Sequence, residues 1–358
     1  MKTMKHLFFT VFAATLFLTS CSSDDDGIGP DPVPEGDYAE GSFVLNEGNS
    51  NPATASISFI ANDGTLTNDI FRKVNPDAAE IGTFLQNMFF DDTRAFIVSG
   101  SANSVTVVDR YTFEYVATIS SDFENPRYGT IVGSKAYVTN AANFAQGSND
   151  NFLTVINLDD YSTEKVVLNN SAEKILSEDG KVYISNGYYG EGNSIDVFDP
   201  TSNTVEKIID LGKGNIPNSF QEEDDKILVM TADSTGLGKL FTIDLASASI
   251  EQTLTLPEAT VSPGNIKIDD NKIYYTSGNA VYTIEQGETT FPEEALINFN
   301  TDESFSYLYG FDVEDDVIYI SDSGNYATDS EAYRYSLDGN LEQTYTVGVG
   351  PNGFYTND

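Results

Sequence analysis

The sequence has few of the residues on which most catalytic and metal sites depend. Its 358 residues contain one histidine, His6, one cysteine, Cys21, and no tryptophan. Ser-His-Asp and Cys-His catalysis need an imidazole, as do His-ligated zinc and iron sites. Because His6 falls in a predicted leader and Cys21 is a predicted lipidation site, we expect a mature protein with no catalytic residues of these kinds, no metal and no cofactor. We predict that it is not an enzyme.

Basic residues are also scarce. Removal of Lys2 and Lys5 with the leader leaves 16 basic residues against 56 acidic ones, a net charge of −40. Such a surface repels phosphate backbones and anionic lipid headgroups. We therefore expect no nucleic-acid partner, and contact with a membrane only through a lipid anchor.

Residues 1–20 have the pattern of a lipoprotein signal peptide. Lys2 and Lys5 precede an apolar run, Leu7–Leu18, which is too short to cross a bilayer. The run leads into Leu18-Thr19-Ser20-Cys21, which looks like a lipoprotein cleavage site. Cys21 is therefore the predicted position of the diacylglycerol.

Residues 21–39 contain the lipidated cysteine and a segment rich in Asp, Pro and Gly without periodicity, which indicates a flexible acidic tether. Ser22-Ser23-Asp24-Asp25-Asp26 resembles the acidic export signal of surface lipoproteins in Bacteroidetes. The same run also fits a solvating spacer. We expect an outer-membrane, lipid-anchored protein facing the cell exterior, with inward exposure as the alternative.

Residues 40–358 consist of a repeated unit of short strands. An aromatic or aliphatic residue recurs in one strand of each unit, in steps of 53, 41, 46, 45, 46 and 45 residues, at Phe43, Phe96, Tyr137, Tyr183, Leu228, Tyr274 and Tyr319. A period near 45 with four short strands is typical of a β-propeller. A linear array of seven weakly similar β units is the alternative.

The two ends of this region indicate how the ring closes. The first unit starts at Gly41–Leu45 without a preceding strand, whereas the last unit is followed by Gly350-Pro351-Asn352-Gly353-Phe354-Tyr355. That run resembles the segments that lead into the first strand of other units. The sequence predicts an all-β fold, a seven-bladed propeller of four-stranded antiparallel blades (a to d from the axis outwards), closed by the C-terminal strand.

Two kinds of loop are predicted to lie on one face of the propeller. They are the loops that join strand b to strand c and the segments that join one blade to the next. Strand b ends there on a polar residue in every blade, at Asn46, Ser99, Asn140, Asn186, Thr231, Ser277 and Asp322. Seven equivalent polar positions would surround one mouth of the channel. They would bind ligand there, or they would only cap strand ends; both interpretations stay open.

Aromatic and amide residues gather on the same predicted face. The b–c loops contain Phe144, Tyr188, Tyr189 and Tyr326, and the segments between blades contain Arg127, Tyr128, Tyr309, Asn352 and Phe354. Such side chains suit a large, polar but uncharged ligand. Ordinary loop packing is the alternative for about half of them.

Several of these runs resemble a known group. Phe43-Val44-Leu45-Asn46-Glu47-Gly48 and Asn125-Pro126-Arg127-Tyr128 are similar to the YncE-like propeller lipoproteins of Bacteroidetes, over nearly the whole domain. Ser171-Ala172-Glu173-Lys174 departs from the usual proline at the start of a blade. The group includes BtuG-like proteins that capture cobalamin and pass it to a TonB-dependent transporter. The resemblance thus implies a non-enzymatic capture role, with a corrinoid as a possible ligand and such a transporter as the partner.

Two other functions are open at this stage. One is a protein-interaction or adhesion propeller without a small ligand, whose loop face would be flat. The other is a carboxylate-based glycan hydrolase or lyase, which needs two carboxylates about 5–10 Å apart in a cleft. The sequence contains too many acidic residues to single out such a pair.

Overall fold

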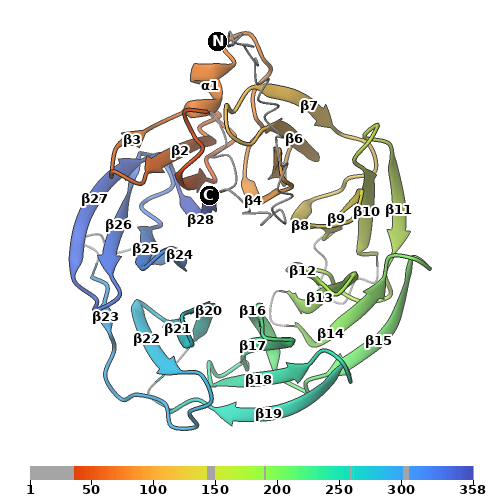
Figure 1. The fold of residues 1–358 in the computed structure, drawn as a ribbon, viewed down its shortest axis with the longest axis vertical. Helices are drawn as coiled ribbons and strands as arrows, with labels where there is room; N and C mark the ends of the chain where they lie inside the picture. Colours follow the sequence, from red (N-terminus) through yellow and green to blue (C-terminus); the bar gives the residue numbers. More distant parts are fainter. Residues whose placement is uncertain are drawn as a thin grey trace, which may run out of the picture. The chain divides into compact units, whose positions relative to one another are not determined.

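The computed structural model describes residues 36–142, 150–188, 191–258, 260, 262–300 and 306–357, without the side chain of Tyr188. Seven four-stranded sheets are arranged around a central axis (Figure 1). All neighbouring strands within a sheet are antiparallel, with the chain running outwards from the axis in each blade. The predicted seven-bladed propeller is therefore confirmed.

Each blade contributes one strand to each of four layers. The innermost strands are β28 (Pro351–Asn357), β4 (Leu85–Phe90), β8 (Pro126–Val132), β12 (Ile175–Glu178), β16 (Ile216–Glu223), β20 (Pro263–Asp269) and β24 (Leu308–Glu314). The second layer is β1 (Gly41–Asn46), β5 (Arg94–Ser99), β9 (Lys135–Asn140), β13 (Lys181–Tyr188), β17 (Lys226–Ala232), β21 (Lys272–Ser277) and β25 (Val317–Asp322).

The outer two layers are less regular. The third is β2 (Ser56–Ala61), β6 (Ser104–Asp109), β10 (Phe152–Asn157), β14 (Glu191–Asp199), β18 (Gly238–Asp244), β22 (Ala280–Glu285) and β26 (Ser330–Ser336). The outermost is β3 (Leu66–Thr67), β7 (Tyr115–Ile119), β11 (Thr163–Val167), β15 (Thr204–Asp210), β19 (Ser249–Thr255), β23 (Ile297–Asn298) and β27 (Leu341–Val347). A short helix, α1 (Ile70–Val74), follows β3 and accounts for the long first step of the repeat.

The first blade is built from both ends of the chain. β28 pairs with β1, placing Gly41 opposite Asn357 and Phe43 opposite Tyr355. This pairing supplies the inner strand that the first unit lacks, as predicted. It also removes the free edge that β1 would otherwise expose.

The hydrophobic core is divided among the seven contacts between adjacent blades. Each contact has its own cluster; the one between the second and third blades contains Phe89, Phe96 and Val138. Phe89 and Phe96 stack with ring centroids 5.0 Å apart. Gly129 of β8 lies against Phe89, where an added Cβ would come within 2.1 Å of the ring, so only glycine fits. All seven repeat-marking residues are buried in the second layer.

The propeller begins slightly before the predicted boundary at residue 40. The Tyr38 ring packs edge-on against Phe59 at 5.3 Å and Phe113 at 5.9 Å, and the Tyr38 amide donates to the carbonyl of Tyr111. Residues 36–39, predicted to be the end of the tether, therefore belong to the folded unit. The rest of the predicted signal peptide and tether, including Cys21, lies outside the described residues. No helix within the described ranges is long and apolar enough to cross a membrane.

Most of the aspartates at the turns between the two outer layers form the turns, as their spacing suggests. The side chains of four of them accept a hydrogen bond from the backbone amide two or three residues further along the chain; these are Asp63, Asp109, Asp199 and Asp244. In the third blade Asn157 and Asp160 accept such bonds instead of Asp159. Much of the acidity of the chain thus serves local turn geometry.

One carboxylate is buried inside a blade. Asp196 in β14 is 2% exposed and accepts a hydrogen bond from Asn186 Nδ2 at 2.6 Å. Burial raises the pKa of Asp196 to about 6, against the lowering effect of this bond. Ionisation at neutral pH therefore opposes folding.

We predict that Asp196→Asn raises the free energy of unfolding at pH 7 by roughly 1–3 kcal/mol, because the amide keeps the acceptor and removes the charge. The folded pKa is above the unfolded one, so wild-type stability should rise as pH falls from 7 to 5, and the variant should lose this dependence. Urea unfolding of both proteins at pH 7 and pH 5 measures the free energy of unfolding and its pH dependence. Asp63→Asn, at an exposed turn, is the control and should leave the pH dependence intact. An unchanged pH dependence in Asp196→Asn would contradict the prediction.

Candidate functional site

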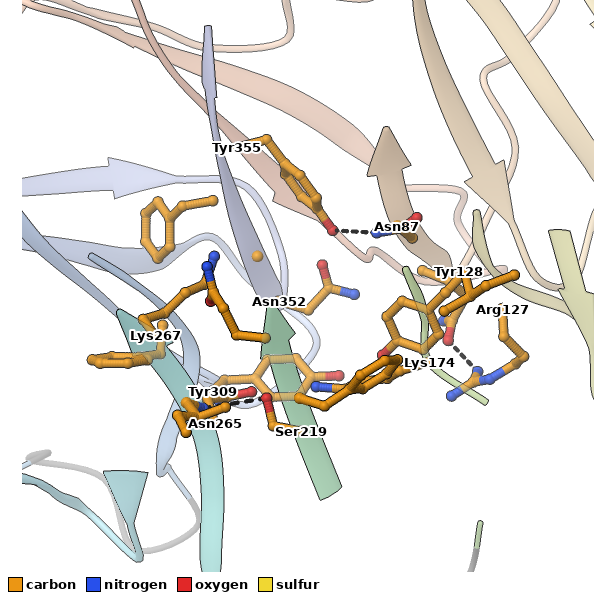
Figure 2. Close-up of a pocket in the computed structure, with 18 residues that line it drawn as sticks. Asn87, Arg127, Tyr128, Lys174, Ser219, Asn265, Lys267, Tyr309, Asn352 and Tyr355 are labelled. Carbon is orange, nitrogen blue, oxygen red and sulfur yellow. Dashed lines mark hydrogen bonds between the residues drawn. The ribbon is translucent and has the colours of Figure 1, made fainter. Parts of the chain in front are cut away.

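The inner strands of all seven blades surround a cavity of about 520 Å³ in the channel (Figure 2). It lies at the end of the channel where the inner strands begin, on the face that carries the segments between blades. Its lining residues are Gln86, Asn87, Arg127, Tyr128, Lys174, Ile175, Ser219, Phe220, Gln221, Asn265, Ile266, Lys267, Tyr309, Phe311, Asn352, Gly353, Phe354 and Tyr355.

A local backbone irregularity recurs where the inner strands reach this cavity. The pairing register shifts between Pro126 and Gly129 in β8, between Pro263 and Ile266 in β20, and between Leu308 and Phe311 in β24. Similar shifts occur in β4, in β16 and in the β28–β1 pair. A bulge breaks the alternation of side chains along a strand. Two successive side chains of one strand can then face the channel, as Arg127 and Tyr128 do.

Hydroxyl groups on the second-layer strands hold this backbone in place. The Tyr128 amide donates to Thr139 Oγ1 at 3.0 Å, the Lys174 amide to Ser185 Oγ at 3.0 Å, and the Asn265 amide to Thr276 Oγ1 at 2.8 Å. The Gly310 amide donates to Ser321 Oγ at 2.7 Å. Each of these hydroxyl residues directly precedes one of the seven polar positions predicted from the sequence.

Arg127 links three blades at the cavity wall. Its guanidinium donates to both oxygens of Glu173, with the shortest contact at 2.6 Å, and to Gln86 Oε1. Both side chains of the Arg127–Glu173 pair are less than a fifth exposed. The paired geometry neutralises the charge of Arg127 and fixes its position.

Lys267 forms a second neutralised pair. Its Nζ lies 2.5 Å from Asp312 Oδ1, and the Asp312 side chain is 5% exposed. Burial by itself would lower the pKa of Lys267, but the Asp312 carboxylate, with Glu314 beyond it, raises the pKa above its ordinary value. Lys267 is therefore a cation at neutral pH.

Lys174 has a different environment. Its Nζ lies 5.8 Å from the centroid of the Tyr128 ring and makes no hydrogen bond or ion pair with any described residue. Burial lowers the pKa of Lys174 to about 8; Glu173 opposes this effect, and Lys267 and Arg127 add to it. The ammonium is thus mostly charged at neutral pH without a paired carboxylate.

Three tyrosines and one glutamate form a cluster at the rim. Tyr309 packs edge-on against Tyr307 at 5.6 Å and Tyr326 at 5.7 Å, and its hydroxyl donates to Glu47 Oε2. The hydroxyls of Tyr307 and Tyr326 lie 2.7 Å apart. Burial raises the pKa of Glu47, although the Tyr309 bond and Arg127 oppose this. The cluster holds the Tyr309 ring against the cavity.

The far ends of the inner strands are acidic. Burial raises the pKa values of Glu222, Asp269 and Glu314, and neighbouring carboxylates raise them further. The cavity wall, in contrast, includes three cations and no Asp or Glu among its described lining residues. The two halves of the channel therefore differ in the sign of their charge.

Several polar groups on the cavity wall have no partner among the described residues. They are the Tyr128 hydroxyl, the side-chain amides of Asn265 and Gln221, the Lys174 ammonium and the buried Asn352 Oδ1. The Asn352 amide group itself donates to the carbonyl of Leu85 at 2.7 Å, which fixes its orientation. Groups of this kind offer hydrogen bonds to a ligand or to water.

The structure brings five of the predicted binding residues together at the cavity: Arg127, Tyr128, Tyr309, Asn352 and Phe354. Tyr326 lies beside them in the rim cluster. Phe354 is 4% exposed and stacks on Tyr319 at 5.1 Å, so it mainly packs between blades.

Three of the four predicted asparagine positions are not on the cavity wall. Asn46, Asn140 and Asn186 are fully buried, and each donates its amide to a side chain on the third-layer strand: Ser58, Thr154 and Asp196 respectively. Their geometry is that of strand-end caps, the alternative left open by the sequence. Phe144, Tyr189 and the side chain of Tyr188 lie outside the described residues.

Several lining residues were missed from the sequence, among them Asn87, Lys174, Asn265, Lys267 and Tyr355. Asn87 Nδ2 donates to the Tyr355 hydroxyl at 3.2 Å, and partial burial raises the pKa of Tyr355 to about 12. A signal was present: alignment of the segments that begin each blade places Asn87, Lys174 and Asn265 at the position of Tyr128. No group of three or more His, Cys, Asp or Glu suited to a metal ion occurs in the described ranges.

Sequence comparison assigns the chain to a family. Residues 40–348 match the domain of unknown function DUF5074, and the protein belongs to this propeller family. No curated protein matches the sequence.

Solved structures resemble the fold. A quinonprotein alcohol dehydrogenase-like protein from Bacteroides thetaiotaomicron has a TM-score of 0.66 at 15% identity, covering 90% of this chain and 79% of its own. Kuenenia stuttgartiensis hydrazine synthase has a TM-score of 0.60 at 16% identity, covering 77% and 91%. The Myceliophteria thermophila Cps50 (Swd1) β-propeller domain scores 0.54 at 10% identity, covering 73% and 89%. These likenesses concern the fold alone.

We predict that Lys267→Met lowers the free energy of unfolding by roughly 3–5 kcal/mol, because it leaves the Asp312 carboxylate buried without a counter-ion. The double variant Lys267→Met/Asp312→Asn should recover most of the loss, since the amide keeps the bond that Asp312 Oδ1 accepts from the Val313 amide at 3.0 Å. Urea unfolding at pH 7 measures all three proteins. A double variant no more stable than the single one would refute this account of the pair.

Proposed function

We propose that the protein is a non-enzymatic, lipid-anchored binding protein of the cell surface that captures a small polar nutrient in its channel cavity. The observation that carries this proposal is the set of unpartnered polar groups on the cavity wall, above all the Tyr128 hydroxyl, the Asn265 amide and Asn352 Oδ1. Asn352 Oδ1 is buried away from bulk water, where polar groups are normally paired, and the partly exposed Tyr128 and Asn265 line the same cavity. A ligand that reaches all three would complete their hydrogen bonds.

The dimensions and chemistry of the cavity support the same proposal. A volume of about 520 Å³ is within the range of small-molecule sites. Tyr128, Tyr309 and Phe220 supply apolar surface beside amides and hydroxyls. A ligand with both a flat apolar face and several hydroxyl or amide groups would use both kinds of contact.

The two alternatives find less support. An adhesion propeller with a flat loop face has no need of a cavity with convergent polar groups. A carboxylate-based hydrolase or lyase requires two acidic side chains next to the substrate, and the described lining has none. Glu47 and Glu173 lie nearby, but each is already hydrogen-bonded to a neighbouring side chain.

The finer parts of the proposal come from the resemblance to the YncE-like propeller lipoproteins. They are anchoring through Cys21 at the outer membrane, capture of cobalamin or a related corrinoid as in BtuG-like members, and transfer to a TonB-dependent transporter. A corrinoid is larger than the cavity, so it would cover the cavity mouth and contact the rim. The cavity is on the face that carries the segments between blades, where a partner transporter would receive the ligand.

We predict that cyanocobalamin or a neutral sugar binds the purified full chain, and that Tyr128→Ala weakens binding at least about tenfold, as loss of a central aromatic contact does. Calorimetry with a thermal-shift measurement tests this. Tyr115→Ala, which changes an exposed tyrosine on the outermost layer, is the control and should bind as the wild type does.

The outcomes separate the parts of the proposal. Binding of a sugar but not of any corrinoid would keep capture and remove the cobalamin assignment. Binding that Tyr128→Ala leaves unchanged would place the site elsewhere. If neither corrinoids nor sugars bind, capture itself is wrong and an interaction propeller becomes the better account.

A further inference from the structure

The positive charge at the cavity is unusual for this chain. The mature protein has 16 basic residues against 56 acidic ones, yet three cations and no carboxylate are among the described lining residues. Structural turns explain much of the surface acid, but no such local role explains three cations that converge on one cavity from three blades.

Two of these cations are already neutralised. Arg127 is paired with Glu173 at 2.6 Å, and Lys267 with Asp312 at 2.5 Å. The pairs hold their side chains in place, so neither presents a full uncompensated charge to the cavity.

Lys174 is the remaining cation. It is partly buried, lies 5.8 Å from the Tyr128 ring centroid and has no hydrogen bond or ion pair within the described part of the chain. The charged and titratable groups around it are Arg127 and Tyr128 from β8, its neighbour Glu173, Lys267 from β20, Tyr309 from β24, Tyr355 from β28 and, beyond Tyr309, Glu47. Figure 2 shows Lys174 beside Tyr128 on one wall of the cavity.

We infer that Lys174 binds the carboxylate of an acidic monosaccharide, a hydroxylated ring that carries one negative charge. This deepens the proposed function and rests on it. The hydroxyls of the sugar would bond to the unpartnered Tyr128 hydroxyl, Asn265 amide and Asn352 Oδ1, and its apolar ring face would lie on an aromatic side chain.

The number of free charges favours a group with one negative charge, such as a carboxylate, over a doubly charged phosphate monoester. One cation is uncompensated, so one negative charge restores neutrality. A second charge would come close to Glu173, Asp312 and Glu47, which are fixed by their own partners. The ligand inferred here is a monoanion, whereas the sequence led us to expect an uncharged one.

Matched sugar pairs test this inference on the full chain. We expect galacturonate or glucuronate to bind more tightly than galactose or glucose, which lack only the carboxylate. Lys174→Met should weaken binding of the acid about 10- to 100-fold, as loss of a charge-assisted hydrogen bond does, and change binding of the neutral sugar less than about twofold. Lys174→Arg should restore part of the affinity for the acid.

Lys213→Met is the matched control. Lys213 is exposed in the segment between β15 and β16 and is not one of the residues that line the cavity, so its removal changes the net charge equally without removing a lining side chain. It should leave the preference for the acid intact.

A pH series gives a second readout that a structural role of Lys174 would not produce. Affinity for the acid should fall above about pH 8, where the free ammonium deprotonates, and the neutral sugar should show no such change. Acid binding near pH 8 should also take up protons, which calorimetry in two buffers detects. Lys174→Met should abolish both effects.

Failure of this inference can be told from failure of the proposed function. If neutral sugars bind in the cavity or cyanocobalamin binds over its mouth, and the acids bind no better, capture stands and the acidic ligand class is wrong. Acid preference that survives Lys174→Met also overturns the role of Lys174. If no sugar, acid or corrinoid binds, both proposals fail.

Discussion

The pairing of the two chain ends is the constraint on which the rest of the structure depends. β28 completes the first blade by bonding to β1 from Gly41 to Asn46, and each blade packs its apolar face only against its two neighbours. Without that strand the first blade would lack its inner layer, and the clusters on both sides of it would open to water. Closure also brings Asn352 and Tyr355, from the end of the chain, beside Gln86 and Asn87, so the cavity exists only in the closed ring.

All seven blades contribute polar side chains to the cavity wall. The bulges of the inner strands give up ladder hydrogen bonds, and hydroxyls such as Thr139 and Ser321 replace some of them. The bulges in six blades let successive side chains face one level of the channel. Two ion pairs join neighbouring blades at the cavity wall, Arg127 with Glu173 and Lys267 with Asp312. They stabilise the wall and neutralise two of its cations.

Charge separation along the channel has a structural origin. The inner strands begin near cations and end near carboxylates, because the turns between the first two layers are built from acidic residues such as Asp270 and Asp315. Burial, and to a smaller extent mutual repulsion, raises the pKa values of the carboxylates at that end. An anion in the channel is therefore drawn to the end with the cavity, and away from the opposite mouth, by the fixed arrangement of the blades.

The sequence by itself determined the architecture. Alternating strands at a period near 45, aspartates at turns and a C-terminal run that resembles the start of a blade were enough to define seven blades and their closure, because these signals are local and repeated. It also pointed to Arg127, Tyr128, Tyr309 and Asn352, through their place in the segments between blades. Only the tertiary structure separated Asn46, Asn140 and Asn186, which cap strands inside the blades, from residues that face the channel. It alone distinguished Lys174 from Arg127 and Lys267, since the presence or absence of a carboxylate partner depends on strands that are adjacent in the ring and distant in the chain.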